Sequence, residues 1–150
     1  MPRTALVALL TVYLTFYASL ATSEEPASPL IGLNVEQVDL VLNNLQQDYV
    51  TCAAFFTLTA GALDKRDDET AQGYIDATDQ ALTMALQIAD IVTISEDATR
   101  ARYEMALDEM TNRIDSNFNN FSILMNDHLR KCQALMNNPD QRTQYWVDQL

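Results

Sequence analysis

The sequence predicts an all-α fold, an up-down-up-down four-helix bundle with a short C-terminal helix, closed by one disulfide. Apolar residues recur at three- and four-residue spacing through most of the chain after residue 34, which is the spacing of one helix face. The chain has only three glycines and four prolines, so few positions interrupt helices. Its two cysteines, Cys52 and Cys132, suit one disulfide in an oxidising compartment.

Residues 1–23 have the features of a secretory signal peptide. Arg3 supplies a positive start, an uncharged and largely apolar run covers residues 5–20, and small residues follow at the spacing of a cleavage site. Because the run is slightly shorter than the ~20 residues of a membrane-spanning helix, we expect cleavage and a secreted or periplasmic protein. An uncleaved membrane anchor is the alternative.

The protein is strongly acidic. The full chain has 21 acidic and 9 basic residues, and removal of Arg3 with the signal peptide leaves 21 against 8, a net charge of −13. Such a surface repels phosphate backbones and anionic lipid, which argues against nucleic acid as a partner. It favours an unknown protein partner, expected to be basic, and membrane contact is expected only if residues 1–23 stay attached.

Residues 24–33 contain two of the four prolines and are expected to form an extended leader before a helical bundle domain over residues 34–150. Asn34 and Gln37 have the spacing of a capping box at the start of a helix over residues 35–63. The inner face of this helix is predicted to carry Val38, Val41, Leu42, Leu45, Tyr49, Cys52, Phe56 and Leu63.

Two further helices are expected to follow. One begins at Asp68 or Glu69 and has small residues four apart, so a neighbouring helix can lie close to that face. These small residues are Ala77, Ala81, Ala85 and Ala89. Ser95, with Glu96 behind it, marks the start of the other helix. The inner side of this third helix is predicted to carry Ala98, Arg102, Met105, Leu107, Met110 and Ile114.

The disulfide decides whether residues 96–137 form one helix or two. Periodicity alone permits one helix, but Cys132 would then lie ~29 Å from Cys52 along the bundle axis, whereas the bond needs Cα atoms within ~7 Å. A chain reversal near residues 116–119 lowers this gap to ~15 Å, and helix stagger or a slightly later break would close the rest. We therefore predict two helices, with the bond contributing ~4 kcal/mol by closing most of the domain into one loop.

Pro139 suits the first turn of a short terminal helix over residues 140–148. That helix carries Tyr145 and Trp146, which are the best candidates for an interface because aromatic side chains anchor many protein contacts. The other role expected for the two aromatics is to cover one end of the bundle.

His128 is the only histidine. One hypothesis makes His128 and a methionine from a facing helix, Met105 or Met110, the axial ligands of a b-type haem inside the bundle. A lone histidine on a helix is more often structural, so we expect no cofactor and no metal site. The sequence has no Gly-x-Ser-x-Gly elbow, no Glu-x-x-His motif and no glycine-rich phosphate loop, and we expect no enzymatic activity.

These features favour an exported acidic helical bundle that acts without catalysis, by binding another macromolecule. An inhibitor, an immunity protein or an envelope-assembly factor would each fit this description. Two alternatives stay open at this point: a haem- or metal-binding bundle that uses His128, and a membrane-anchored structural subunit that keeps residues 1–23.

Overall fold

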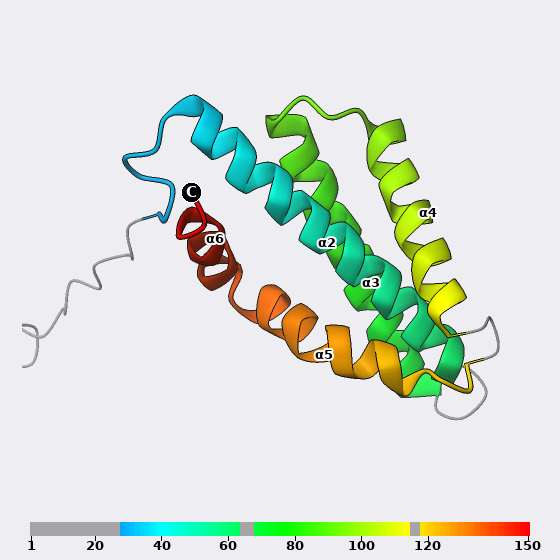
Figure 1. Cartoon of the computed structure of the whole chain (residues 1–150). Coiled ribbons are helices and arrows are strands. Elements are labelled where there is room, and N and C mark those ends of the chain that lie inside the picture. Colours follow the sequence, from blue (N-terminus) through cyan, green and yellow to red (C-terminus); the bar gives the residue numbers. More distant parts are fainter. Residues whose placement is uncertain (1–27, 64–67, 115–117) are drawn as a thin grey trace, which may run out of the picture.

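The computed structural model describes residues 28–63, 68–114 and 118–150, and these residues form helices and no strand (Figure 1). The predicted all-α bundle with a short C-terminal helix is confirmed, while the predicted signal peptide, residues 1–23, lies outside the described residues. The helices are α2 (Val35–Leu63), α3 (Asp68–Ile91), α4 (Glu96–Arg113), α5 (Ser122–Asn137) and α6 (Pro139–Val147).

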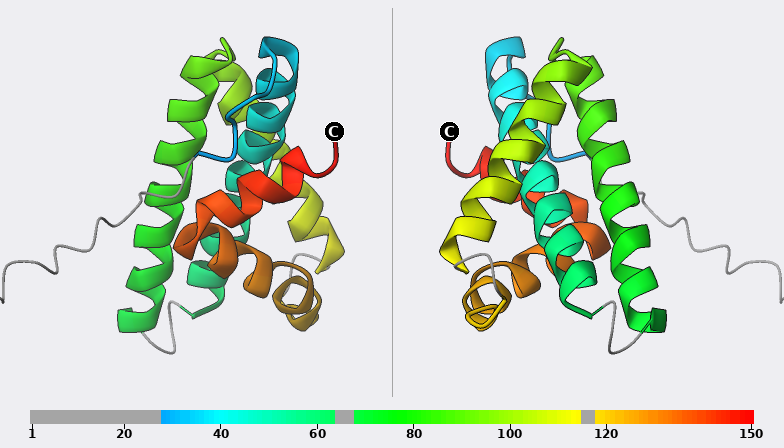
Figure 2. Two further views of the ribbon diagram at one scale, coloured as in Figure 1. Left: turned by 90° about the vertical axis from the view of Figure 1, so that its left-hand side faces the viewer. Right: turned by 90° about the vertical axis from the view of Figure 1, so that its right-hand side faces the viewer.

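The central element is α2, because α3, α4, α5 and α6 all pack against it. Figure 1 shows α4 on one side of α2 and the α5–α6 segment on the other, and Figure 2 shows α3 running along α2. Because α2 has neighbours in several directions, it buries side chains on more than one of its faces. Every residue from Cys52 to Phe56 is buried, which a helix covered on one side only could not achieve.

The small-residue face predicted on α3 is confirmed. Ala81, Ala85 and Ala89 are almost completely buried. Their small side chains let α3 approach α2 closely, and large residues of α2 fill the remaining space. One such contact joins the rings of Phe56 and Tyr74, whose centroids lie 5.9 Å apart.

Residues 28–33 of the predicted extended leader form turns instead. The amide of Leu33 donates to the carbonyl of Leu30 at 3.3 Å, and the Leu30 side chain packs against the core. Gly32 has φ +91°, a conformation that glycine adopts without the steric cost of a side chain. The segment therefore turns back onto the bundle, because Leu30 has apolar surface to bury and Gly32 permits the turn.

Two predicted helix starts are confirmed by their capping hydrogen bonds. The Asn34 side chain accepts from the Gln37 amide at 2.9 Å, and the Gln37 side chain accepts from the Asn34 amide at 3.1 Å, which is a complete capping box. The Ser95 side chain accepts from the Ala98 amide at 3.1 Å and caps α4.

The predicted inner face of α4 is confirmed for four of its six residues, because Met110 and Ile114 are buried and Arg102 and Leu107 are half-buried. The other two, Ala98 and Met105, are exposed. Met105, expected inside, is 70% exposed, whereas the buried residues of α4 are Thr99, Ala106 and Met110. Thr99 is buried because its hydroxyl accepts a hydrogen bond from the buried Gln46 side chain of α2 at 3.2 Å. A polar pair and a small alanine thus fix the contact between α4 and α2, so the apolar residues alone do not determine which face is inside.

The chain reverses between α4 and α5, and the predicted disulfide is confirmed with a Cα–Cα distance of 5.3 Å. The α2 helix ends and α5 begins at the same end of the bundle (Figure 1). At 1.5 Å per residue, Cys52 lies about 16 Å before the end of α2 and Cys132 about 15 Å after the start of α5. The two cysteines therefore lie at the same level of the bundle, and the expected gap between them is absent.

Within the part of the chain that the structure describes, no helix is long and apolar enough to cross a membrane.

Replacing both cysteines by alanine is expected to lower the free energy of unfolding by about 4 kcal/mol, because the unfolded chain loses a large closed loop. Urea denaturation followed by circular dichroism measures this change. Reductant should destabilise the wild-type protein and leave the Cys52→Ala/Cys132→Ala variant unaffected. A loss smaller than about 1 kcal/mol would contradict the stabilising role of the bond.

Candidate functional site

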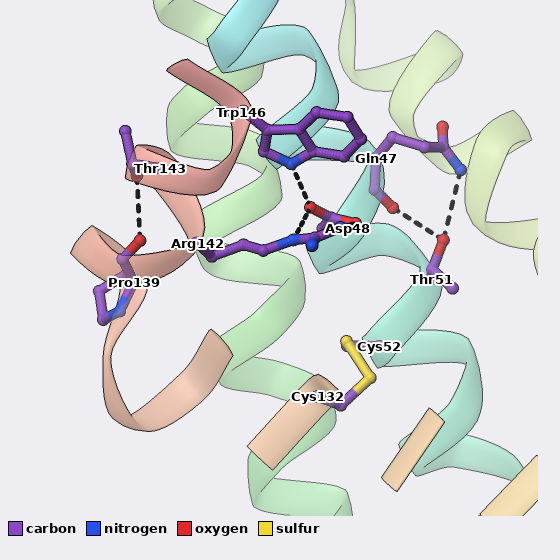
Figure 3. A network of polar contacts seen from close by, with 9 residues as sticks. All are labelled: Gln47, Asp48, Thr51, Cys52, Cys132, Pro139, Arg142, Thr143 and Trp146. Carbon is purple, nitrogen blue, oxygen red and sulfur yellow. Dashed lines mark hydrogen bonds and ion pairs between the residues drawn. A yellow bond between two sulfur atoms is a disulfide. The ribbon is translucent and has the colours of Figure 1, made fainter. Parts of the chain in front are cut away.

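The two aromatics predicted as a contact surface, Tyr145 and Trp146, lie on α6 beside a carboxylate of α2. The indole N–H of Trp146 donates to the carboxylate of Asp48 at 2.6 Å (Figure 3). Arg142 donates to the same carboxylate twice, from Nε at 2.7 Å and from Nη2 at 2.9 Å. Asp48 therefore fastens α6 to α2 through three charge-assisted hydrogen bonds.

Both aromatic rings also contact the guanidinium of Arg142. Its central carbon lies 4.3 Å from the ring centroid of Tyr145 and 4.7 Å from that of Trp146. The hydrogen bond to Asp48 raises the pKa of Arg142 above its already high ordinary value, so the cation is permanent. Trp146 is half-buried and acts as a structural anchor, whereas Tyr145 is 45% exposed and is the member of the pair that a partner could reach.

Sequence reasoning missed Asp48 and Arg142. The available signal was an aspartate beside the predicted inner residue Tyr49, together with a single arginine in the terminal helix. Nothing in the sequence pairs these two residues, because they are 94 positions apart and periodicity reports only on local structure.

The residues of the haem hypothesis come together in one groove, which α2, α4 and α5 line. His128 of α5 lines a cavity of about 410 Å³ with Met105 and Met110 of α4. Met110 is buried, whereas Met105 is exposed. Charged side chains also line this groove, namely Arg102, Asp108, Glu109 and Arg113.

The geometry of His128 does not present a ready ligand. Its Nε2 atom is buried without a hydrogen-bond partner, and its ring lies 5.7 Å from the ring of Phe55. Axial haem ligation needs a coordinating nitrogen that the iron can reach, whereas the Nε2 atom of His128 is covered by protein atoms. Among the described residues there is also no group of three or more His, Cys, Asp or Glu that could hold a metal ion. Haem or metal binding stays a hypothesis.

The surroundings of His128 favour its neutral form. Burial lowers the pKa of the imidazole below its ordinary value, and the nearby cations Arg113 and Lys131 lower it further. Asp127 and Glu109 act in the opposite direction. A charged imidazole at this place would lie against the core without a partner for Nε2, which is the physical reason for the lowered pKa.

The acidic residues of α3 lie in a part of the bundle without basic side chains of its own. Neither α2 nor α3 contains a lysine or an arginine. Two arginines of α4 are bonded to carboxylates of the same chain, Arg100 to Glu96 at 3.0 Å and Arg113 to Asp127. The exposed acidic residues of α3 are Glu69, Asp76, Asp79 and Asp90. The outer surface of α3 therefore carries a net negative charge.

No family model, no curated protein and no solved structure matches this chain. Its function is therefore inferred from the geometry and charge of its own residues.

Replacing Asp48 by alanine is expected to cost about 2 kcal/mol of stability, because it leaves a half-buried guanidinium and an indole N–H without their acceptor. Trp146 is the only tryptophan, so its fluorescence reports on the α6 contact directly. We expect the emission to shift to longer wavelength. Asp148→Ala is the control, because Asp148 directly follows α6, is exposed and accepts a hydrogen bond from Gln144 of that helix. An unchanged emission in Asp48→Ala would refute the anchoring role.

Stability is expected to fall as the pH drops through about 6.5, the ordinary pKa of histidine in an unfolded chain. Because the pKa of His128 is lowered in the native state, the unfolded chain binds this proton first. Protonation then favours unfolding until the native imidazole is also protonated. Urea unfolding at about pH 7.5 and about pH 5.5 measures the effect, and His128→Phe should reduce it. Equal losses of stability in the wild-type protein and in His128→Phe would show that His128 is not responsible.

Proposed function

We propose that this protein is exported and acts without catalysis, by binding a basic protein through its acidic surface. The observation that carries this proposal is the set of exposed carboxylates on α3. Neither α3 nor its neighbour α2 contains a basic residue that could neutralise them. Charge of one sign on one face speeds the encounter with an oppositely charged partner and disfavours partners of like charge.

Export is supported by the disulfide and by the predicted signal peptide. Cys52 and Cys132 are both buried and joined to each other, and such a bond persists in oxidising compartments such as the periplasm or the extracellular space. The N-terminal pattern of residues 1–23 independently favours secretion.

A role without catalysis is supported by the state of the usual reactive groups. The described residues contain no free cysteine to act as a nucleophile. The single histidine has its Nε2 covered, and its pKa is lowered by burial. General acid–base catalysis would need a titratable group within reach of a substrate, and His128 does not offer its Nε2 in this way.

Three roles share this chemistry: an inhibitor, an immunity protein and an envelope-assembly factor. Each would recognise a cationic protein surface outside the cytoplasm. Electrostatic complementarity contributes to the rate and specificity of such recognition more than to its affinity, so apolar contacts must supply part of the binding energy.

Capture of partners from a native extract tests this function. At about 50 mM salt we expect the immobilised mature protein to retain a specific basic protein, and at about 500 mM salt to release it, because screening weakens contacts between exposed charges. The triple variant Asp76→Asn/Asp79→Asn/Asp90→Asn on α3 should lose this capture.

A matched control changes the net charge equally on other surfaces. The variant Asp108→Asn/Glu109→Gln/Asp148→Asn alters α4 and the C-terminus and should still retain the partner. Capture that is insensitive to salt, or that both variants lose equally, would overturn binding through the acidic face of α3.

A further inference from the structure

A second groove lies between α3 and α4. Both helices pack against α2 more extensively than against each other. In the right-hand view of Figure 2 they diverge from the turn that joins them, with α2 visible between them. A cavity of about 320 Å³ lies in this gap, lined by side chains of α3 and α4.

The floor of the groove is apolar and firmly held. Leu82 and Leu86 line it from α3, and Tyr103 lines it from α4. The Tyr103 hydroxyl is hydrogen-bonded to that of Thr57 on α2 at 2.8 Å, which fixes the ring. Leu86 is 39% exposed, so a large aliphatic side chain offers unburied surface inside a concave site.

The rim of the groove is acidic. Arg100 is bonded to Glu96 at 3.0 Å, so these two lining residues largely neutralise each other, and Glu104 gives the lining a net negative charge. On α3, Asp79 and Asp90 lie about one turn beyond the two leucines, at either end of the same stripe. Both aspartates are exposed. An apolar centre is thus bordered by carboxylates.

We propose that this α3–α4 groove binds an amphipathic basic helix of the partner. Its apolar side chains would pack on Leu82, Leu86 and Tyr103, and its lysines or arginines would lie near the surrounding carboxylates. Helices that bind in grooves use anchors at i, i+3, i+4 and i+7, and the lining from Glu96 to Glu104 spans about 12 Å, or about two helical turns. This inference rests on the proposed function and names its site.

Other occupants fit the groove less well. A second copy of this chain would bring two strongly acidic surfaces together, and their repulsion opposes such a dimer. A small molecule would be poorly enclosed, since ligand pockets bury about 70–90% of the ligand surface and this groove is only partly enclosed.

The test uses a fluorescein-labelled synthetic peptide of about 14 leucines and lysines, arranged so that leucine lines one helix face. A peptide of the same composition in scrambled order is the control. Fluorescence anisotropy with the mature, disulfide-bonded protein should show at least about tenfold tighter binding of the amphipathic peptide.

Two matched pairs of variants locate the binding. Leu86→Lys should weaken binding of the amphipathic peptide by about tenfold, whereas Ile123→Lys on α5 should not. These two residues have almost equal exposure, 39% and 40%. Glu104→Gln in the groove should weaken binding more than Glu109→Gln, which lines the groove on the other side of α4. Circular dichroism confirms that each variant is folded.

The outcomes separate this inference from the proposed function. Equal binding of both peptides, equal effects of the two lysine variants, or no binding of the amphipathic peptide would each overturn the groove as the site. Salt-sensitive capture of a basic protein would still stand in those cases. Failure to capture a basic protein would overturn the proposed function. The claim that the groove binds a helix of such a partner would then fall with it.

Discussion

The Cys52–Cys132 disulfide joins α5 to the central helix, and the arrangement of the C-terminal third of the chain depends on that link. Asp48 lies one turn before Cys52 on α2, so the two residues share a face. Asp48 holds α6 through Arg142 and Trp146, as Figure 3 shows beside the disulfide. One face of α2 therefore fixes both terminal helices, by a covalent bond and by a charged hydrogen-bond cluster one turn away.

In this arrangement one side of the molecule is occupied by contacts within the chain, and another side leaves a groove open to a partner. The α5–α6 segment covers one side of α2, and its best aromatic anchor, Trp146, is used within the chain. On the other sides, α3 and α4 diverge and leave an apolar groove with acidic surroundings. The central helix has too many buried residues to offer a binding face of its own. We therefore propose that α3 and α4 carry recognition.

Local signals predicted much of the fold. The capping box at Asn34, the cap at Ser95 and the alanine face of α3 each depend on residues close in sequence, and each is confirmed. Long-range polar contacts could not be predicted. Periodicity does not show that Gln46 meets Thr99, so the burial of Thr99 and the exposure of Met105 were not predicted. The Asp48 cluster and the α3–α4 groove need the helices already in place, because both depend on tertiary packing.

The central claim is that α3 and α4 bind the partner while α5 and α6 hold the fold. Titration of the ¹⁵N-labelled mature protein with the amphipathic basic peptide, followed by two-dimensional NMR, tests it most directly. The account predicts that chemical-shift changes concentrate at residues 79–90 of α3 and 96–104 of α4, with little change from residue 122 onward. Changes centred on α5 and α6, or spread evenly over the acidic surface, would contradict it.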